Sequence, residues 1–183
     1  MGAKNILLGW VHMKKLNDEY KRLMQEAKYY LQEAEDKNEK LQKTIDEIKV
    51  NVLAKSVLDS CLNAIEATIR ACIIAAGHSF GKEIKSERFG NIIKTTHKTL
   101  YSLFFSKFGK LIDTAIEYKG IKFSRIPTTI LDYRNVLYPG VSSLSIETRK
   151  EISEFSVSAT NIWVSYIEKE LLLKTLHKKR KTN

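Results

Sequence analysis

The longest uniform feature of this chain is a stretch without glycine or proline. From Trp10 to Ala76 neither residue occurs in 67 consecutive positions, and these two residues are the strongest breakers of regular structure. The stretch also lacks the strict apolar–polar alternation expected of half-buried strands. It therefore predicts long helices and an all-α fold.

The first part of this stretch carries a narrow apolar stripe. Between residues 10 and 52, nine basic residues balance nine acidic ones, as on a solvated helix face. Spacings of three and four, typical of a coiled-coil seam, relate most of the stripe residues, which are Leu16, Tyr20, Leu23, Ala27, Tyr30, Ala34, Leu41 and Ile48. We expect an N-terminal helical arm over residues 10–52.

The chain beyond the arm has the wider apolar face of a bundle core, which predicts a second unit over residues 53–175. Its first helix has apolar residues at Leu58, Cys61, Leu62, Ile65, Ile69, Cys72, Ile73 and Ala76. Further helices are predicted over 87–107, 110–119, 127–138 and 145–175, followed by a basic tail at 176–183. In the last helix the predicted inward residues are Ile152, Phe155, Ala159, Ile162 and Tyr166. The predicted fold is an up-and-down bundle of five or six helices with a long N-terminal coiled-coil-like helix.

Cysteine use and hydropathy indicate a reducing, cytoplasmic location without a membrane partner. Cys61 and Cys72 lie eleven residues apart in one predicted helix, or about 16 Å, whereas a disulfide needs Cα atoms within about 7 Å. The longest uncharged run, residues 155–167, is shorter than the roughly 20 apolar residues that span a bilayer. The N-terminal segment also lacks the apolar core of a signal peptide.

The charge of the chain favours an acidic partner. Lys and Arg outnumber Asp and Glu by 31 to 21, a net charge of +10. Residues 81–125 contain ten basic and four acidic residues. Residues 174–183 contain five more basic residues and no acidic one. These segments are either solvated surface or a phosphate-attracting face for nucleic acid.

Residues for metal or cofactor chemistry are not apparent in the sequence. The histidines His12, His78, His97 and His177 are not at metal-ligand spacing with Cys, Asp or Glu. Phosphate-binding glycine loops and nucleophile motifs are also missing. We therefore predict no cofactor and no metal. His97 is either a surface histidine or a residue recruited to a cleft between helices.

The segment "DYRNVLYPG", residues 132–140, concentrates polar side chains where a helix must end. Arg134 offers a planar fork that matches phosphate, Asn135 can donate and accept hydrogen bonds, and Tyr138 can stack. In the structural alternative, Arg134 caps helix carbonyls, Asp132 pairs with a lysine and the tyrosines pack. The sequence leaves both possibilities open.

Four segments, taken in order, resemble the HEPN family of higher eukaryote and prokaryote nucleotide-binding domains. They are "AKSVLDSCLNAIEATIRACIIAAG", "TTHKTL", "DYRNVLYPG" and "SIETRKEISEFSVSATNIWVSYIEKEL". With "EAKYYLQEAE", which is similar to the first helix of archaeal and bacterial members, the resemblance covers most of residues 20–170. It implies a four- or five-helix bundle, usually dimeric.

The resemblance also implies a site. Active HEPN members are metal-independent ribonucleases whose motif is Arg, a polar residue and then a His. Arg134 and Asn135 match its start, but the His position holds Pro139, Gly140 or Val141. Tyr138 is a weak substitute, because a phenol of pKa about 10 is poorly matched to neutral pH. We therefore expect binding without catalysis.

Three functions follow as hypotheses. The first is a non-catalytic HEPN-like protein that binds RNA or a nucleotide through Arg134, Asn135, Tyr138 and His97, in a cleft formed by a homodimer. The second is a ribonuclease toxin of a toxin–antitoxin pair, with a nucleotidyltransferase-like partner protein and an unorthodox acid or base such as His97. The third is a structural or partner-binding helical module, in which "RNVLYPG" only ends a helix.

Overall fold

The computed structural model describes the backbone of residues 3–75, 116–118, 121–123, 126–137 and 144–180. Within it, side chains are described for residues 18–71, 126, 129–137 and 144–169. This part of the chain is predominantly helical, as predicted. Its helices are α1 (Ala3–Lys43), α2 (Glu47–Ala75), α5 (Ile126–Leu137) and α6 (Ile146–Arg180). The predicted helix over 87–107 lies outside the described residues.

A short hairpin corrects one predicted helix. Strands β1 (Ile116–Tyr118) and β2 (Ile121–Phe123) pair antiparallel, with Ile116 opposite Phe123. Residues 116–118 were expected in a helix over 110–119. Their sequence, Ile-Glu-Tyr, alternates apolar and polar side chains, which suits a strand.

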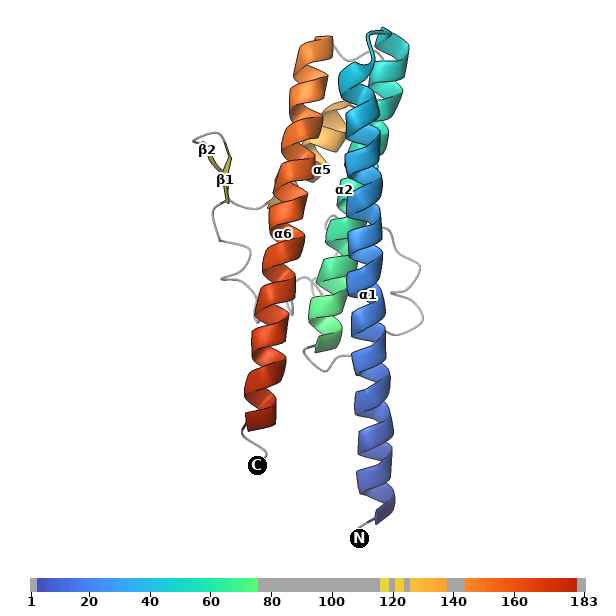
Figure 1. The fold of residues 1–183 in the computed structure, drawn as a ribbon, viewed down its shortest axis with the longest axis vertical. Coiled ribbons are helices and arrows are strands. Elements are labelled where there is room, and N and C mark those ends of the chain that lie inside the picture. The colour runs from blue at the N-terminus through green and yellow to red at the C-terminus, as the bar shows by residue number, and fades with distance from the viewer. Residues whose placement is uncertain (1–2, 76–115, 119–120, 124–125, 138–143, 181–183) are drawn as a thin grey trace.

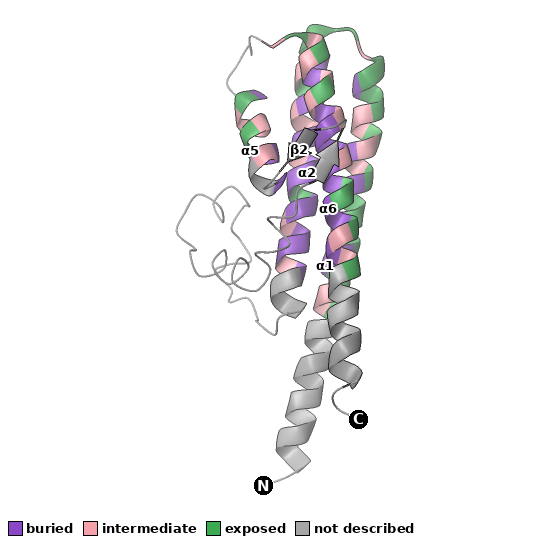
Figure 2. Cartoon of the chain, turned by 90° about the vertical axis from the view of Figure 1, so that its left-hand side faces the viewer, coloured by how far each residue is buried: buried purple, intermediate pink, exposed green. Residues whose placement is uncertain are grey.

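The three long helices lie side by side along the length of the molecule, with α5 against the upper half of α2 (Figure 1). The core of the bundle lies between the inward faces of α1, α2 and α6. Figure 2 shows the buried residues of this core along α2. Leu41, Val57, Leu58, Ile65 and Ile167 are fully buried members of this core. Among the described helices, none has an apolar stretch long enough to cross a bilayer.

The turn between α1 and α2 falls at residues 44–46, inside the predicted arm. It needs neither glycine nor proline. The Thr44 hydroxyl donates to the carbonyl of Lys40, 2.8 Å away, and the Asp46 carboxylate accepts the backbone N–H of Lys49, also at 2.8 Å. Thr44 thus ends α1, and Asp46 is the N-cap of α2.

The apolar stripe of α1 packs within its own chain. Leu23, Ala27, Ala34 and Leu41 are buried in the core shared with α2 and α6. Ile48, predicted to continue the stripe, is instead 77 % exposed. Because the chain reverses at residues 44–46, Ile48 lies on the outer side of α2.

Helix α6 buries most of the predicted face, since Ile152 and Tyr166 also pack against the core. Phe155 and Ala159 are buried as expected, but Ile162 is exposed. The buried part of α6 also includes three small hydroxyl residues, and Ser153, Ser156 and Thr160 each donate to the carbonyl four residues earlier. These hydroxyls are satisfied by their own helix, so they can be buried at little cost. Apolar periodicity could not detect these three buried hydroxyl residues.

Candidate functional site

The predicted site begins on α5, whose position follows from its sequence. Pro127 occupies the first turn, where its missing N–H costs no hydrogen bond. Ile126, Ile130 and Leu137 are buried against the bundle and fix the orientation of the helix. Arg134 consequently lies in the last turn of α5, where a cation interacts favourably with the negative end of the helix dipole.

Arg134 contacts α2 through an ion pair. Its Nε donates to Oδ1 of Asp59 over 3.1 Å. The two side chains are 30 % and 41 % exposed, so water screens the pair and its net contribution to stability is about 0–1 kcal/mol. The guanidinium is thus held at the edge between α2 and α5, within reach of solvent.

A second arginine, Arg149, has a structural role in this fold and can be compared with Arg134. Arg149 on α6 has a side chain only 2 % exposed, and its Nη2 lies 3.5 Å from Oε1 of Glu47 at the start of α2. This contact links the first turns of α2 and α6, although the Glu47 side chain is 66 % exposed. Arg134 differs because solvent reaches its side chain, although both arginines have a carboxylate partner.

The structure places two of the four predicted site residues. Arg134 and Asn135 are neighbours in the last turn of α5, and both are half-buried. Tyr138 and His97 lie outside the described residues. Tyr133, from the same segment, packs edge-on against Phe155 of α6 with ring centroids 5.8 Å apart. One tyrosine of "DYRNVLY" therefore has the packing role that the structural alternative expected.

Asp59 is the site residue that the sequence did not reveal. It lies on α2, 75 positions before Arg134, within the segment "VLDSCLN". An aspartate among the several charged residues of α2 has no local pattern that connects it with a distant arginine. Only the packing of α5 on α2 identifies the pair.

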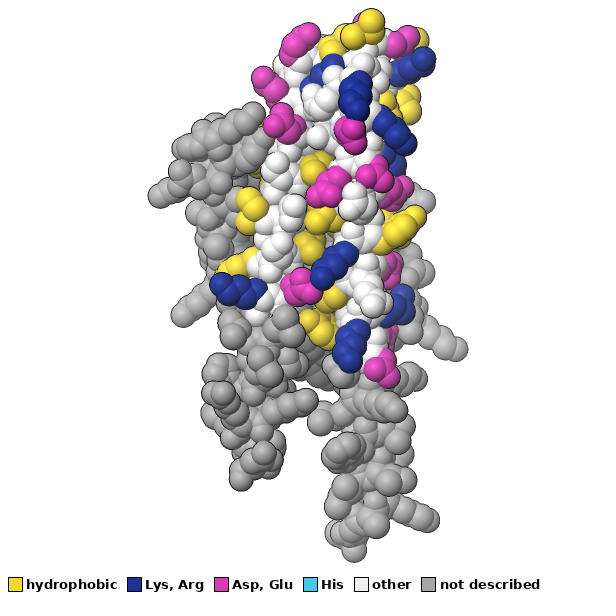
Figure 3. Space-filling model, in the orientation of Figure 1, with side chains coloured by type: hydrophobic (Ala, Val, Ile, Leu, Met, Phe, Trp, Pro, Cys, Tyr) yellow, Lys and Arg dark blue, Asp and Glu magenta, His cyan; other side chains and the backbone are white. Residues whose placement is uncertain are grey.

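The net positive charge of the protein does not come from the described bundle. Side chains described in the structure include 13 basic and 16 acidic residues, which leaves 18 basic and 5 acidic residues for the rest of the sequence. Both signs alternate over α1 and α6 on the face seen in Figure 3. Any polyanion attracted by charge would therefore depend mainly on basic residues outside this body.

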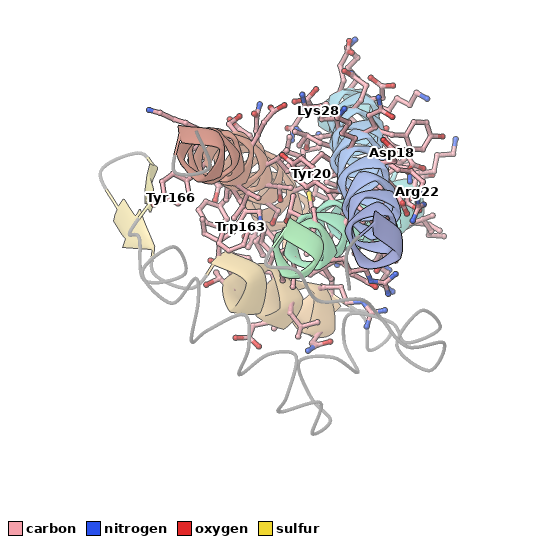
Figure 4. The ribbon with its side chains drawn as sticks, turned by 90° about the horizontal axis from the view of Figure 1, so that it is seen from below. Asp18, Tyr20, Arg22, Lys28, Trp163 and Tyr166 are labelled. Atoms are coloured by element: carbon pink, nitrogen blue, oxygen red, sulfur yellow. The ribbon has the colours of Figure 1, made fainter. Side chains whose placement is uncertain are left out.

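Other polar groups of the bundle have structural roles. The indole N–H of Trp163 donates to the Thr68 hydroxyl at 2.8 Å, in the buried space between α6 and α2 (Figure 4). The pKa of Tyr30 is raised mainly by burial and, to a smaller extent, by the nearby carboxylates of Glu26, Glu33 and Glu66.

A shallow groove of about 580 Å³ lies on the outer face of α6. Its described lining residues are Ser158, Asn161, Ile162, Ser165, Tyr166 and Lys169.

In the described part of the chain, no group of three or more His, Cys, Asp or Glu residues could hold a metal ion. Cys61 is buried, as predicted, and its burial raises the pKa of the thiol to about 12.

Comparison of the chain with protein-family models, curated proteins and solved structures gave no match.

Proposed function

We propose that the chain is a non-catalytic, HEPN-like helical protein that binds RNA or a nucleotide through a site containing Arg134 and Asn135. The observation that carries this proposal is the partial exposure of Arg134 at the α2–α5 edge. A guanidinium that solvent reaches can present N–H groups to a phosphate, which a fully buried one such as Arg149 cannot do.

Asp59 gives this site a competing anion. A phosphate that approaches Arg134 meets a carboxylate already bound to Nε, so binding requires the ligand to share or displace that contact. The cost is small because the pair is solvent-exposed, about 0–1 kcal/mol. Arg134 supplies the charge-matched contact, and the basic residues of 81–125 and of the tail supply the longer-range attraction.

The experiment that tests the proposal is a titration of the full chain with a labelled single-stranded RNA, repeated with a labelled nucleotide, at increasing salt. If about six phosphates are neutralised, RNA affinity should fall by about 300-fold between about 50 and 200 mM salt, because the salt slope of a single strand is about 0.7 per phosphate. Failure to bind either ligand at low salt would exclude this function.

A homodimer or partner-binding role has one specific observation in its favour. At the turn between α1 and α2, Ile45, Ile48 and Val52 are 87 %, 77 % and 61 % exposed. Exposed apolar clusters of this kind mark contact surfaces more often than isolated exposed residues do. If a second copy covers them, the protein should sediment as a dimer and the Ile48→Asp variant as a monomer. A mass of 21.0 kDa for the unsubstituted protein would exclude the homodimer.

The ribonuclease alternative depends on His97 as its acid or base. That residue lies outside the described part of the chain, so ribonuclease activity stays a prediction of the second hypothesis. Hydrolysis of labelled RNA by the protein, lost in His97→Ala, would support it.

A further inference from the structure

Helix α6 has an outward face between two borders that the structure defines. On one border Glu168 faces α1, with its Oε1 2.7 Å from Lys28 Nζ. On the other border Tyr166 packs partly against the core (Figure 4). Between these borders the repeat of an α-helix gives an arc of about 100°. Within residues 154–169 this arc, which we call the α6 seam, consists of Glu154, Ser158, Asn161, Ile162, Ser165 and Lys169.

Most of the α6 seam is open to solvent. Its exposed members are Asn161, Ser165, Lys169 and Ile162, of which the last is a large apolar residue with 42 % exposure. The other two members are half-buried. The shallow groove on the outer face of α6 is lined by five of the six seam residues together with Tyr166. A partner can therefore reach the seam along its length.

The charges of the α6 seam lie at its two ends. Residues 155–167 contain no charged residue, although 28 % of the whole chain is charged. Glu154 comes immediately before this run and Lys169 two positions after it. Figure 3 shows the same order along α6, with acidic side chains in its upper part, uncharged ones in the middle and basic charge at the lower end of its described part. Solvated surfaces ordinarily carry charges of both signs interspersed, so this order favours a contact surface.

The pattern of the seam is complementary to itself. If two α6 helices pair antiparallel about a two-fold axis between residues 161 and 162, Glu154 of one copy is level with Lys169 of the second, because both are equally far from the axis in sequence. By the same count Ser158 is level with Ser165. A two-fold interface makes each contact twice, so the pairing forms two ion pairs. Parallel pairing would instead place like charges together.

The two residues beside the axis would each meet their own copy. Ile162 against Ile162 removes exposed apolar surface from water. Asn161 can bond to its copy because a side-chain amide both donates and accepts. In the single chain Asn161 donates to Glu35 Oε1 and accepts from Ser165 Oγ, and both bonds are 3.4 Å long. Bonds of this length are weak, so exchanging them across an interface costs little.

We propose that the α6 seam is the surface through which two copies of this chain associate, with their α6 helices antiparallel. The seam is about 22 Å long. A single pair of helices of this length buries less than the roughly 1,600 Å² of a standard interface. The dimer should therefore be reversible, with an affinity in the micromolar range.

Other occupants match the seam less well. RNA would meet one lysine and one glutamate, which give no net attraction for phosphate. A membrane would bury Asn161 and the two serines without hydrogen-bond partners. An unrelated helix could bind, but it would not require the two ends of the seam to complement each other. The interface is also separate from Ile48 at the turn between α1 and α2, and it is independent of the function proposed for Arg134.

The test is sedimentation equilibrium of the full chain, in which the mass should approach twice 21.0 kDa as concentration rises. Glu154→Lys and Lys169→Glu each convert two attractions into two repulsions. Since an exposed ion pair contributes up to about fivefold, each single substitution should weaken association by about tenfold or more. An equimolar mixture of the two variants should associate again, because each then meets the opposite charge in the other. The chain with both substitutions should also recover.

The matched control is charge reversal at Arg22 and Glu26, an exposed pair on α1. Figure 4 shows Arg22 on the side of α1 away from α6, so Arg22→Glu and Glu26→Lys should leave association unchanged. Ile162→Asp should also weaken the dimer, whereas Ile48→Asp should not. Because Ile162 and Lys169 are exposed, the melting temperatures of these variants at low concentration should stay close to that of the unsubstituted protein.

Three results would overturn the proposal. The first is a mass of 21.0 kDa at every concentration up to about 200 μM, well above the micromolar range expected of a small interface. The second is normal association of either single charge variant, or no recovery in their mixture. The third is dissociation by Ile48→Asp with no effect of Ile162→Asp, which would place the contact between copies at the turn between α1 and α2.

Discussion

The ion pair between Arg134 and Asp59 permits a quantitative test of whether Arg134 serves binding or only stability. The variants are Arg134→Ala, Asp59→Asn and the double substitution. Since the bond of the pair is 3.1 Å long and its side chains are 30 % and 41 % exposed, its coupling free energy should be about 0.2–1 kcal/mol. For a chain of this length that corresponds to about 2–4 °C in melting temperature per kcal/mol.

Binding should respond to the two substitutions in opposite directions. If Arg134 contacts a phosphate, Arg134→Ala removes charge-assisted hydrogen bonds of about 1.5–3 kcal/mol each, so RNA affinity should fall about ten- to hundredfold. Asp59→Asn removes the competing carboxylate, so affinity should rise by up to about fivefold, the equivalent of the pair's own free energy. In the double variant the effect of Asp59→Asn on affinity should disappear.

The assays are urea denaturation for stability and fluorescence anisotropy with labelled RNA at constant salt for affinity. Arg22→Ala and Glu26→Gln provide the matched control, since this pair on α1 has a comparable distance of 3.2 Å and is also exposed. They should change stability by a similarly small amount and leave affinity unchanged. Affinity that is the same in Arg134→Ala, Asp59→Asn and the unsubstituted protein would refute the binding role and leave the pair as a fastening of α5 to α2.

The bundle itself gives three further predictions. Leu41→Ala should destabilise the protein by about 2–5 kcal/mol because Leu41 is fully buried, while Ile48→Ala should cost less than about 0.5 kcal/mol in the same urea titration; equal costs would contradict packing of the stripe within one chain. Thr68→Val removes the acceptor of the Trp163 indole N–H and should cost about 1–3 kcal/mol, whereas Thr68→Ser should retain most of the stability. Because the pKa of Cys61 is raised from 9.0 to about 12, its contribution to stability is complete below pH 9 and is lost as pH rises toward 12; melting temperatures should therefore fall less steeply over this range in Cys61→Ser, and parallel curves would disprove it.

Sequence patterns predicted the helices well where local chemistry determines them. The helix containing Arg134 was expected over 127–138 and is observed over Ile126–Leu137. Pro127 fixes its first turn. The last helix was expected from about Ser145. The Ser145 hydroxyl accepts the backbone N–H of Thr148 at 3.1 Å, a cap that the local sequence encodes.

Two features of the fold were missed because they depend on polar side chains that bond to the backbone, where sequence patterns look for glycine, proline or apolar residues. The turn at residues 44–46 replaces glycine and proline by side-chain caps from Thr44 and Asp46, which are common residues anywhere on a helix surface. The buried part of α6 includes, beside its apolar residues, hydroxyls bonded to their own helix. In both cases a polar side chain forms a hydrogen bond with a backbone group three or four residues away, and the spacing of apolar residues does not reveal it.

The site was predictable only as far as its residues are adjacent in sequence. Arg134 and Asn135 could be selected from one segment, but the exposure of Arg134 and its pairing with Asp59 depend on how α5 packs on α2. Arg149 shows that the sequence does not reveal whether an arginine is buried or exposed. In sequence it is one of several arginines near a helix start, yet it is the largest fully buried side chain of the described residues. Sequence gives the chemistry of a guanidinium, and packing decides whether a ligand can reach it.

The separation of charge from the bundle affects how the Arg134 site would bind an anion. A body with more acidic than basic side chains repels phosphate at long range, so Arg134, already paired with Asp59, would bind an anion only weakly on its own. Basic segments outside the body must first raise the local concentration of the ligand. If they do, RNA affinity should depend steeply on salt, while the ratio of affinities between the unsubstituted protein and Arg134→Ala should narrow by only about threefold between about 50 and 200 mM salt, because the loss of one phosphate contact lowers the salt slope by about 0.7. A ratio that approaches one at high salt would mean that Arg134 acts only as one more diffuse charge.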